Sequence, residues 1–432
     1  MKKGELETRN AGVHGLGHEE SRSRDGCGLL FITWDGPGSD YLRSLFLPTL
    51  TRLGLDLHVL QLSWDTPDRI DANRAACERA GAGYSHVRIR RFRPLGGATL
   101  ASVALGRPRL LRILRRSRPS WVMPRSTLPA LLVRSVASQL RQSGAKLAFD
   151  ADGMMQDERV EFGGWDPSGA NYRLLREVEA QTVRTADTVI TRTERAKRIL
   201  LARAGPSVAP DKIHVIPNAK DEHAFHPVSP SERASVRESL QVPGDSLLLV
   251  YCGSMGAQYH PRETLEFFQR VRTLRSDSRM LFLTGHEERA RTEARAAGLD
   301  SDLLMIRRVP ADEVPRYLGA ADVAVAFRTP SFSQQAVSPI KIGEFLLCGL
   351  PIVTNAGVGD LDEQLGGFPG AHVVNGFDPT TLQAAAKWAV SVDSGALRAP
   401  CRNRGLEHYS LETALRKYRI SLGLDGNEGA SD

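Results

Sequence analysis

The chain has 432 residues, of which 41% are hydrophobic and 25% charged, and its formal net charge is +7. This apolar share excludes a wholly disordered chain, and no window approaches the ~18 consecutive apolar residues of a membrane-spanning helix. The N-terminus has charge but no apolar segment typical of a secretory signal. The five cysteines form no CxxC pair, which favours a reducing cytoplasm over disulfides or a structural zinc site. At ~150 residues per domain, we predict a cytoplasmic protein of two or three units.

The first half of the chain shows the pattern of a strand, a helix and a second strand. Residues 1–26 are rich in Gly, Ser, Arg and Glu and predict a disordered tail. Residues 29–33 are a short apolar run typical of a buried strand, followed by a helix over 40–53 and a strand over 57–62. This order predicts a parallel sheet with helices on both faces. Further strands are expected near residues 121–123, 146–150 and 187–191.

The positive charge is concentrated in one stretch. Between Arg88 and Arg141 there are 13 arginines and no Asp, Glu or Lys, so the rest of the chain carries −6. Within this stretch, residues 109–118 place Leu and Ile on one helical face and arginines on the other. Three interpretations remain open: a helix with a solvated basic face, a helix lying on anionic lipid headgroups, and nucleic-acid binding. The last lacks the aromatic residues and recognised modules that accompany it.

The alternation of strands and helices restarts after residues 213–218. The expected strands are apolar runs near residues 246–252, 280–284, 304–306, 323–327, 351–354 and 371–374. A helix over 262–275 separates the first two of them. Together with the first half, this pattern predicts an α/β fold of two successive doubly wound units.

The predicted boundaries divide the chain into an N-terminal domain over 27–205, a linker over 206–228 and a C-terminal domain over 229–402. The remaining segment, 403–424, contains a helix from about Ser410 with apolar residues on one face. We expect this helix to cross back onto the N-terminal domain.

Residues 338–351 (SPIKIGEFLLCGLP) have the start and stop signals of a complete short helix. Ser338 is expected at the N-cap and Pro339 at the first helical position, with a glycine just past the end. The free N–H groups and partial positive charge of such a helix start suit a phosphate, and Lys341 adds a full charge. Glu344 shares the face of Lys341 and could accept two ribose hydroxyls. The segment indicates either a nucleotide-diphosphate site or a capped helix with a surface Lys–Glu pair.

This segment resembles the C-terminal motif of the GT-B retaining glycosyltransferases, especially those of family 4. Residues 213–227 (IHVIPNAKDEHAFHP) are similar to the interdomain segment of that family, and 250–256 (VYCGSMG) to the first strand and glycine loop of its donor domain. Residues 149–159 resemble an F-D-x-R-G…D-E-R element of one branch, and 34–37 the start of the acceptor domain. The resemblance covers about residues 29–420. It implies two Rossmann-like domains facing each other across a cleft.

The resemblance also implies roles for individual residues. Glu344 and Asp152 would be catalytic, with Glu344 also the expected ribose ligand. The residues expected to bind the sugar nucleotide are Gly253, Ser254, Ser338, Lys341, Glu344 and Arg307. Arg307 follows a strand, and its alternative role is that of a surface arginine. The sequence departs from the family at three positions: Ala336 replaces a usual Glu, Ser254 a usual Arg, and Asp152 an Arg of one branch.

Membership of this family would imply transfer of a sugar from a nucleotide-diphosphate-sugar donor to a glycan or lipid-linked acceptor, with retention at the anomeric carbon. A helix dipole and a cation would stabilise the leaving diphosphate, so we expect no metal ion and no cofactor besides the donor. The basic stretch motivates a lipid-linked acceptor and peripheral contact with the inner face of an anionic membrane, and nucleic acid is not an expected partner. Two alternatives remain: a sugar-nucleotide epimerase of related architecture, and a degenerate, non-catalytic glycosyltransferase-like protein.

Overall fold

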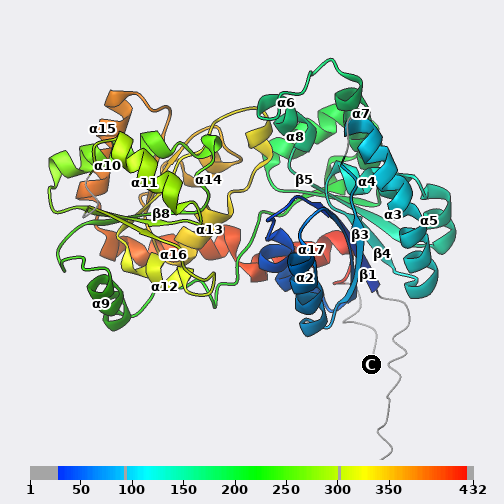
Figure 1. Cartoon of the computed structure of the whole chain (residues 1–432), viewed down its shortest axis with the longest axis horizontal. Coiled ribbons are helices and arrows are strands. Elements are labelled where there is room, and N and C mark those ends of the chain that lie inside the picture. Colours follow the sequence, from blue (N-terminus) through cyan, green and yellow to red (C-terminus); the bar gives the residue numbers. More distant parts are fainter. Residues whose placement is uncertain (1–27, 92–94, 300–302, 426–432) are drawn as a thin grey trace, which may run out of the picture.

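A computed structural model describes residues 28–91, 95–299 and 303–425. The tail predicted for residues 1–26 lies outside these ranges. Within them the chain forms two domains, each built on a parallel sheet, which lie side by side along the longest axis of the molecule (Figure 1). No helix in the described part combines the length and apolarity needed to cross a membrane.

The N-terminal domain contains a seven-stranded sheet in the order β3-β2-β1-β4-β5-β6-β7. Its strands are β1 (Gly28–Asp35), β2 (Asp56–Ser63), β3 (Gly83–Arg88), β4 (Trp121–Pro124), β5 (Lys146–Asp152), β6 (Thr188–Thr191) and β7 (Ile213–Val215). Its helices are η1 (Leu42–Phe46), α1 (Leu47–Leu50), η2 (Thr51–Leu53), α2 (Pro67–Arg79), α3 (Leu95–Ser117), α4 (Thr127–Arg134), α5 (Ala137–Ser143), α6 (Met155–Glu161), α7 (Ala170–Thr185), α8 (Glu194–Ala204) and η3 (Pro210–Lys212).

The sheet of this domain is covered on both faces, as successive residues of β1 demonstrate. Leu30 and Ile32 pack into a core shared with α3 and α4, whereas Leu29 and Phe31 pack into a second core on the opposite face. In that second core the rings of Phe31 and Phe46 stack with centroids 5.1 Å apart. A strand buried on both faces has no polar alternation, which is why β1 is a continuous apolar run in the sequence.

Three elements of this domain differ from the sequence-based predictions. The helix expected over 40–53 is a π-helical turn, η1, followed by the short α1 and the 3₁₀ turn η2. The edge strand β3 was not predicted. The strand β7 lies inside the predicted linker 206–228 and pairs with β6, so the sheet of the N-terminal domain extends to Val215.

The C-terminal domain contains a six-stranded sheet in the order β10-β9-β8-β11-β12-β13. Its strands are β8 (Leu248–Cys252), β9 (Arg279–Leu283), β10 (Leu304–Arg307), β11 (Val323–Ala326), β12 (Ile352–Asn355) and β13 (Ala371–Val374). Its helices are α9 (Pro230–Ser239), η4 (Ala257–Tyr259), α10 (Pro261–Leu274), α11 (Glu287–Ala296), α12 (Val314–Ala320), η6 (Ser333–Ala336), α13 (Ile340–Leu347), α14 (Leu361–Leu365), α15 (Pro379–Ser391) and α16 (Ser394–Tyr409).

The last helix, α17 (Leu411–Leu422), crosses from the C-terminal domain onto the N-terminal one (Figure 1). Ser410 caps it by accepting a hydrogen bond from the backbone N–H of Thr413 at 3.2 Å. Its residues Ala414, Tyr418 and Leu422 are buried in the second core of the N-terminal domain. Residues 403–409, which the sequence grouped with this helix, belong instead to α16.

The helices α13 and α16 pack unusually closely. A Cβ atom at Gly405 would lie 2.7 Å from the backbone nitrogen of Leu347, and one at Gly343 would lie 2.8 Å from the Cβ of Tyr409. Only glycine allows this approach, so α13 is held rigidly against the following helix. The consequence matters for function, because α13 carries Lys341 and Glu344.

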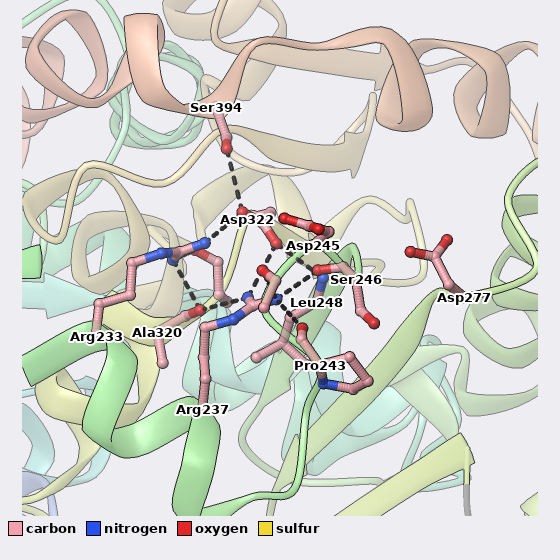
Figure 2. A network of polar contacts seen from close by, with 12 residues as sticks. Arg233, Arg237, Pro243, Asp245, Ser246, Leu248, Asp277, Ala320, Asp322 and Ser394 are labelled. Atoms are coloured by element: carbon pink, nitrogen blue, oxygen red, sulfur yellow. Dashed lines mark hydrogen bonds and ion pairs between the residues drawn. The ribbon is translucent and has the colours of Figure 1, made fainter.

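A network of charged and backbone groups joins the start of the C-terminal domain to its end (Figure 2). Asp322 accepts hydrogen bonds from Arg233 (2.6 Å), Arg237 (3.3 Å), the backbone of Leu248 (2.8 Å) and the hydroxyl of Ser394 (3.3 Å). Arg237 also donates to the carbonyl oxygens of Pro243, Gly244, Ser246 and Ala320. One carboxylate thus ties α9, β8 and α16 to the loop before β11, with its charge fully compensated.

Candidate active site between the two domains

A cleft of about 590 Å³ is lined by residues of both domains. Six residues of its walls stand at or just beyond the carboxyl ends of parallel strands. In the N-terminal domain these are Asp35 at the end of β1, Arg125 after β4, Asp152 at the end of β5 and Arg192 after β6; in the C-terminal domain they are Gly253 after β8 and Arg328 after β11. Ligands of doubly wound folds bind at this edge of the sheet, so the cleft is the candidate site.

The wall of the cleft that the C-terminal domain forms is called the donor-side wall here, after the role that the resemblance implies. It holds a cation without an ion-pair partner among the described residues. The Nζ atom of Lys341 is buried and has no hydrogen-bond partner among the described residues. It lies 4.6 Å and 4.7 Å from the ring centroids of Tyr251 and Tyr259. Burial lowers the pKa of Lys341 to about 8, and the neighbouring charge of Arg328 acts in the same direction. A desolvated ammonium without a counter-ion favours the binding of an anion.

The glycine loop after β8 is adjacent to this lysine. Gly253 has a φ of +122°, and a Cβ atom there would lie 3.1 Å from the Nζ of Lys341. Both the backbone conformation and the close approach therefore require glycine at this position. The structure thus brings together Gly253 and Lys341, which the sequence analysis assigned to the same ligand.

Glu344 lies one turn further along α13 and also lines the cleft. Its Oε1 is 3.0 Å from the Nζ of Lys220, a residue of the segment that follows β7. The surface pair between Lys341 and Glu344 that the sequence left open is therefore not formed, because Glu344 pairs with Lys220 instead. The interdomain segment thus orients the carboxylate that we assigned to the ribose.

The start of α13 faces the cleft but is capped differently from the prediction. The helix begins at Ile340, so Pro339 occupies the N-cap position that was predicted for Ser338. The hydroxyl of Ser338 accepts a hydrogen bond from the backbone of Asn218 at 3.3 Å, and the Asn218 amide donates to the Ser338 carbonyl at 2.8 Å. Ser338 therefore ties the interdomain segment to the helix start and leaves the N–H groups of that start without a side-chain cap.

A second cation on the donor side was not found by sequence analysis. Arg328 lines the cleft, and its guanidinium carbon is 4.9 Å from the ring centroid of Tyr259. The backbone N–H of Arg328 donates to the side chain of Asn355 at 2.8 Å, and the Nε of Arg328 donates to the side chain of Gln334. Ser254, which stands where the family usually has an arginine, lies 3.3 Å from the ring of His286 through its hydroxyl. Arg328 thus supplies positive charge that position 254 lacks.

Arg307, which the resemblance assigned to the sugar nucleotide, does not line the cleft. Arg307 ends β10, which is the edge strand of the sheet, and its exposed side chain is not part of the cleft wall. The sequence feature that could have found Arg328 is its place directly after the apolar run 323–327. That run forms β11, which pairs with β8 at the centre of the sheet.

The wall that the N-terminal domain forms is called the acceptor-side wall. It contains a cluster of arginines and aspartates. Asp152 accepts from Arg125 at 2.7 Å and from Arg192 at 3.3 Å, and it has a φ of +54°. Arg192 also pairs with the fully buried Asp150, and Arg125 lies 3.5 Å from Asp35. Burial acts to raise the pKa of Asp152, but the two arginines outweigh it and hold that pKa below its usual value. Asp152 is therefore an ionised carboxylate held in a fixed position.

Helix α6 contributes further residues to this side of the cleft. In α6, Asp157 pairs with Arg203 at 2.8 Å and is turned away from the cleft, whereas Glu158 and Arg159 line it. Burial raises the pKa of Glu158. Ala336, at the position where the family usually has a first carboxylate, is a buried residue of the cleft wall. Within the described residues, no three His, Cys, Asp or Glu side chains gather as potential metal ligands.

Comparisons with known proteins agree with this architecture. The family described as "Glycosyl transferase 4-like domain" matches residues 46–219, and the family "Glycosyl transferases group 1" matches residues 232–407. The segment 232–407 is thus a domain of the group 1 glycosyltransferases. The two matched segments correspond to the two domains of the chain, with the first including β7 and the second ending within α16.

Two curated relatives are similar to parts of the chain. The D-inositol 3-phosphate glycosyltransferase of Xylanimonas cellulosilytica is 28% identical over 211 residues, which are 46% of this chain and 48% of the relative. The 2-deoxystreptamine N-acetyl-D-glucosaminyltransferase of Streptomyces fradiae is 28% identical over 268 residues, 60% of this chain and 58% of the relative. The chain thus spans about half the length of the curated relatives it matches.

Among solved structures, HepE of Anabaena in complex with UDP and glucose superposes with a TM-score of 0.66. The match covers 92% of this chain and 99% of HepE at 14% sequence identity. At this identity the likeness shows the fold alone, which is GT-B: two Rossmann-like domains that face each other across a cleft.

Proposed function

We propose that the chain transfers a sugar from a nucleotide-diphosphate sugar to a hydroxyl of a glycan or lipid-linked acceptor, with retention at the anomeric carbon. The observation that carries this proposal is the buried, unpaired ammonium of Lys341 beside Gly253 and the start of α13. An isolated buried cation is costly to the folded protein, and a bound diphosphate would provide its missing partner. HepE, a structural neighbour, was crystallised with UDP and glucose, which supports a donor of this class.

In this proposal the donor-side wall stabilises the leaving diphosphate. Lys341, Arg328 and the uncapped N–H groups of α13 would neutralise the charge that develops on the leaving oxygen. A diphosphate next to Lys341 raises the pKa of that lysine, so the lysine is fully ionised when the donor is bound. Three positive groups at one site would suffice for this task without a metal ion. Glu344, oriented by Lys220, would accept the ribose hydroxyls.

The acceptor-side wall would bind the attacking hydroxyl. Asp152 is kept ionised by Arg125 and Arg192, so it is able to accept a hydrogen bond from a hydroxyl and to stabilise positive charge at the anomeric carbon. Its role as a catalytic residue is part of the proposal. We place the reaction in the cytoplasm, at the inner face of a membrane, because the exposed arginines of α3 are suited to anionic lipid.

The transferase is favoured over the two alternatives for specific reasons. Both matching families are described as glycosyltransferases, which argues against an epimerase. Arg328 supplies a cation beside the departure at Ser254, which argues against a degenerate site. An epimerase would convert the sugar without freeing nucleotide, whereas a transferase releases one nucleoside diphosphate for each acceptor that is modified.

Thermal stabilisation by UDP, GDP, ADP and dTDP sugars, with and without EDTA, tests the donor site. At 100 times Kd, a donor that binds only the folded state adds ~2.7 kcal/mol of stability. We expect stabilisation by donors of one base, insensitive to EDTA, in the native protein and in Lys387→Met, whose lysine is exposed on α15. Lys341→Met should abolish it. Equal stabilisation of both variants would contradict the proposed site.

A further inference from the structure

A second cavity, of about 510 Å³, lies in the N-terminal domain next to the cleft. The helix α4 packs against both α3 and α7, and the three helices lie side by side on one face of the sheet (Figure 1). All three contribute to the cavity, with Leu128 and Leu131 from α4, Leu100 from α3 and Leu174 from α7. We call this cavity the apolar groove. Its volume is within the ~300–1,000 Å³ typical of ligand sites.

The walls of the apolar groove are mainly apolar, and their polar residues are three arginines, Thr99 and Asn171. Trp34, Trp64 and Trp165 line it together with the leucines, and the arginines are Arg90, Arg91 and Arg159. The guanidinium carbon of Arg91 lies 4.9 Å from the ring centroid of Trp64, and that of Arg159 lies 4.8 Å from the ring centroid of Trp165. Among the described residues that line the groove there is no carboxylate. This composition suits a molecule that is both apolar and negatively charged.

The apolar groove and the cleft share part of their walls. Trp34, Trp64, Leu128 and Arg159 line both. Arg159 therefore stands where the groove meets the cleft, and Asp152 lines the same cleft. The groove is thus connected to the part of the cleft where the acceptor hydroxyl is expected.

The outer surface of α3 beside the groove also combines apolar and positively charged side chains. Leu110 and Leu114 of α3 are buried in the core, which accounts for the apolar face that the sequence shows over 109–118. Leu100 and Leu105 of the same helix are 57% and 47% exposed. Its arginines at 107, 112, 115 and 116 are also exposed. Exposed leucines beside arginines are typical of a surface that lies on anionic lipid.

We propose that the apolar groove binds the hydrocarbon chain of an anionic amphiphilic acceptor. The phosphate that joins chain and head group lies beside Arg91 and Arg159, and the head group extends into the cleft towards Asp152. This inference rests on the proposed transfer reaction and selects the lipid-linked class among its acceptors. The groove explains how a chain with no membrane-crossing helix in its described part could take an acceptor from a lipid surface.

Binding of alkyl phosphates, followed by tryptophan fluorescence below their aggregation concentration, tests the groove without any donor. Three of the five tryptophans line the groove, so its occupation changes the signal. We expect dodecyl phosphate to bind more tightly than octyl phosphate, by up to about fourfold for each methylene buried. Inorganic phosphate and dodecyltrimethylammonium should give no saturable change. Equal affinity for the two chain lengths would overturn the proposal.

Variants at exposed wall residues locate the binding. Leu100→Glu and Leu174→Glu each place a carboxylate in the groove. Each should raise the Kd for dodecyl phosphate at least tenfold. Leu274→Glu, at a leucine of the C-terminal domain that is 42% exposed, should bind like the native protein. Equal binding by all three variants would overturn the proposal. Stabilisation by the nucleotide sugar should be unchanged in each, so a failure of the groove is distinguishable from a failure of the donor site.

Discussion

The two walls of the cleft use positive charge in opposite ways. On the acceptor side, Arg125 and Arg192 are both paired with aspartates of their own domain. On the donor side, Lys341 is buried against two tyrosine rings and has no hydrogen-bond or ion-pair partner among the described residues. Paired arginines hold carboxylates in place and keep Asp152 ionised, whereas an unpaired lysine is available to a ligand. The comparison predicts that mutations on the acceptor side mainly reduce stability and that mutations on the donor side mainly reduce binding.

The largest effect on stability is expected from Arg192→Met. Arg192 is 3% exposed, and it pairs with the fully buried Asp150 and donates to the carbonyl of Ile216 and the hydroxyl of Tyr418. Its removal leaves a buried carboxylate uncompensated and should lower the free energy of unfolding by about 3–5 kcal/mol. Urea unfolding at pH 7 measures this change.

The second variant Arg192→Met/Asp150→Asn is the control for this prediction. It removes the uncompensated charge and should recover part of the loss. Burial already raises the pKa of Asp150 beside Arg192. In Arg192→Met the folded protein therefore binds a proton more readily than the unfolded chain, so the loss should diminish as the pH falls. A loss independent of pH, and not relieved by Asp150→Asn, would mean that packing rather than charge is responsible.

Lys341→Met should increase the stability of the unliganded protein, whereas Arg192→Met should reduce it. The pKa of Lys341 is lowered to about 8 in the folded state, so between about pH 8 and its unfolded value the unfolded chain binds more protons. The stability of the native protein should therefore rise with pH in that window, and the methionine variant should lack this rise. At pH 7 the variant should be more stable by at most about 3 kcal/mol, a limit set by 1.36 kcal/mol per pKa unit.

The same variant should lose transferase activity by about 100-fold or more, since its diphosphate has no buried cation to contact. For the native protein, Kd for the nucleotide sugar should rise above pH 8 as the free lysine loses its proton. Lys387→Met, at an exposed position, serves as the control for both measurements. If Lys341→Met is less stable than the native protein at pH 7, the ammonium must gain more from its contacts in the folded state than it loses by burial. That result would contradict its description as a cation without a hydrogen-bond or ion-pair partner among the described residues.

The difference between the walls also determines what the sequence was able to predict. The donor side depends on local signals: the start and stop residues around α13 and the glycine after β8 identify Lys341, Glu344 and Gly253. The acceptor side depends on partners far apart in the chain. Asp150 and Arg192 are 42 positions apart, and no pattern within either strand indicates that they meet.

The fold was predictable where strands are buried on both faces. Such strands contain continuous apolar runs, and those of β1, β8 and β9 are evident in the sequence. The edge strand β3 (GYSHVR) has only two buried residues, Ser85 and Val87, so it is not an apolar run and it was missed. The three-residue β7 is too short to give a periodic signal. Strand order is also absent from the sequence, which is why Arg307 was chosen instead of Arg328.

Arg328→Gln tests whether Arg328, rather than Arg307, contacts the nucleotide sugar. The expected effect is smaller than that of Lys341→Met. Loss of one of two donor-side cations should raise the KM for the nucleotide sugar about tenfold, which corresponds to about 1.4 kcal/mol. The KM for the acceptor should not change, because Arg328 stands on the opposite wall. Arg307→Gln, at the exposed end of an edge strand, is the matched control. A larger effect of Arg307→Gln than of Arg328→Gln would restore the original assignment.

The smallest effect is expected at the outer surface of α3. Arg112 is exposed there and no ion pair involves it among the described residues, so its charge is available to lipid. One arginine near an anionic membrane contributes about 1 kcal/mol, so Arg112→Gln should weaken flotation with anionic vesicles about fivefold. Arg291→Gln, an exposed arginine of α11, should float like the native protein. Flotation that resists salt, or that both variants lose equally, would contradict a basic membrane-facing surface on α3, because screening by salt must weaken contacts between exposed charges.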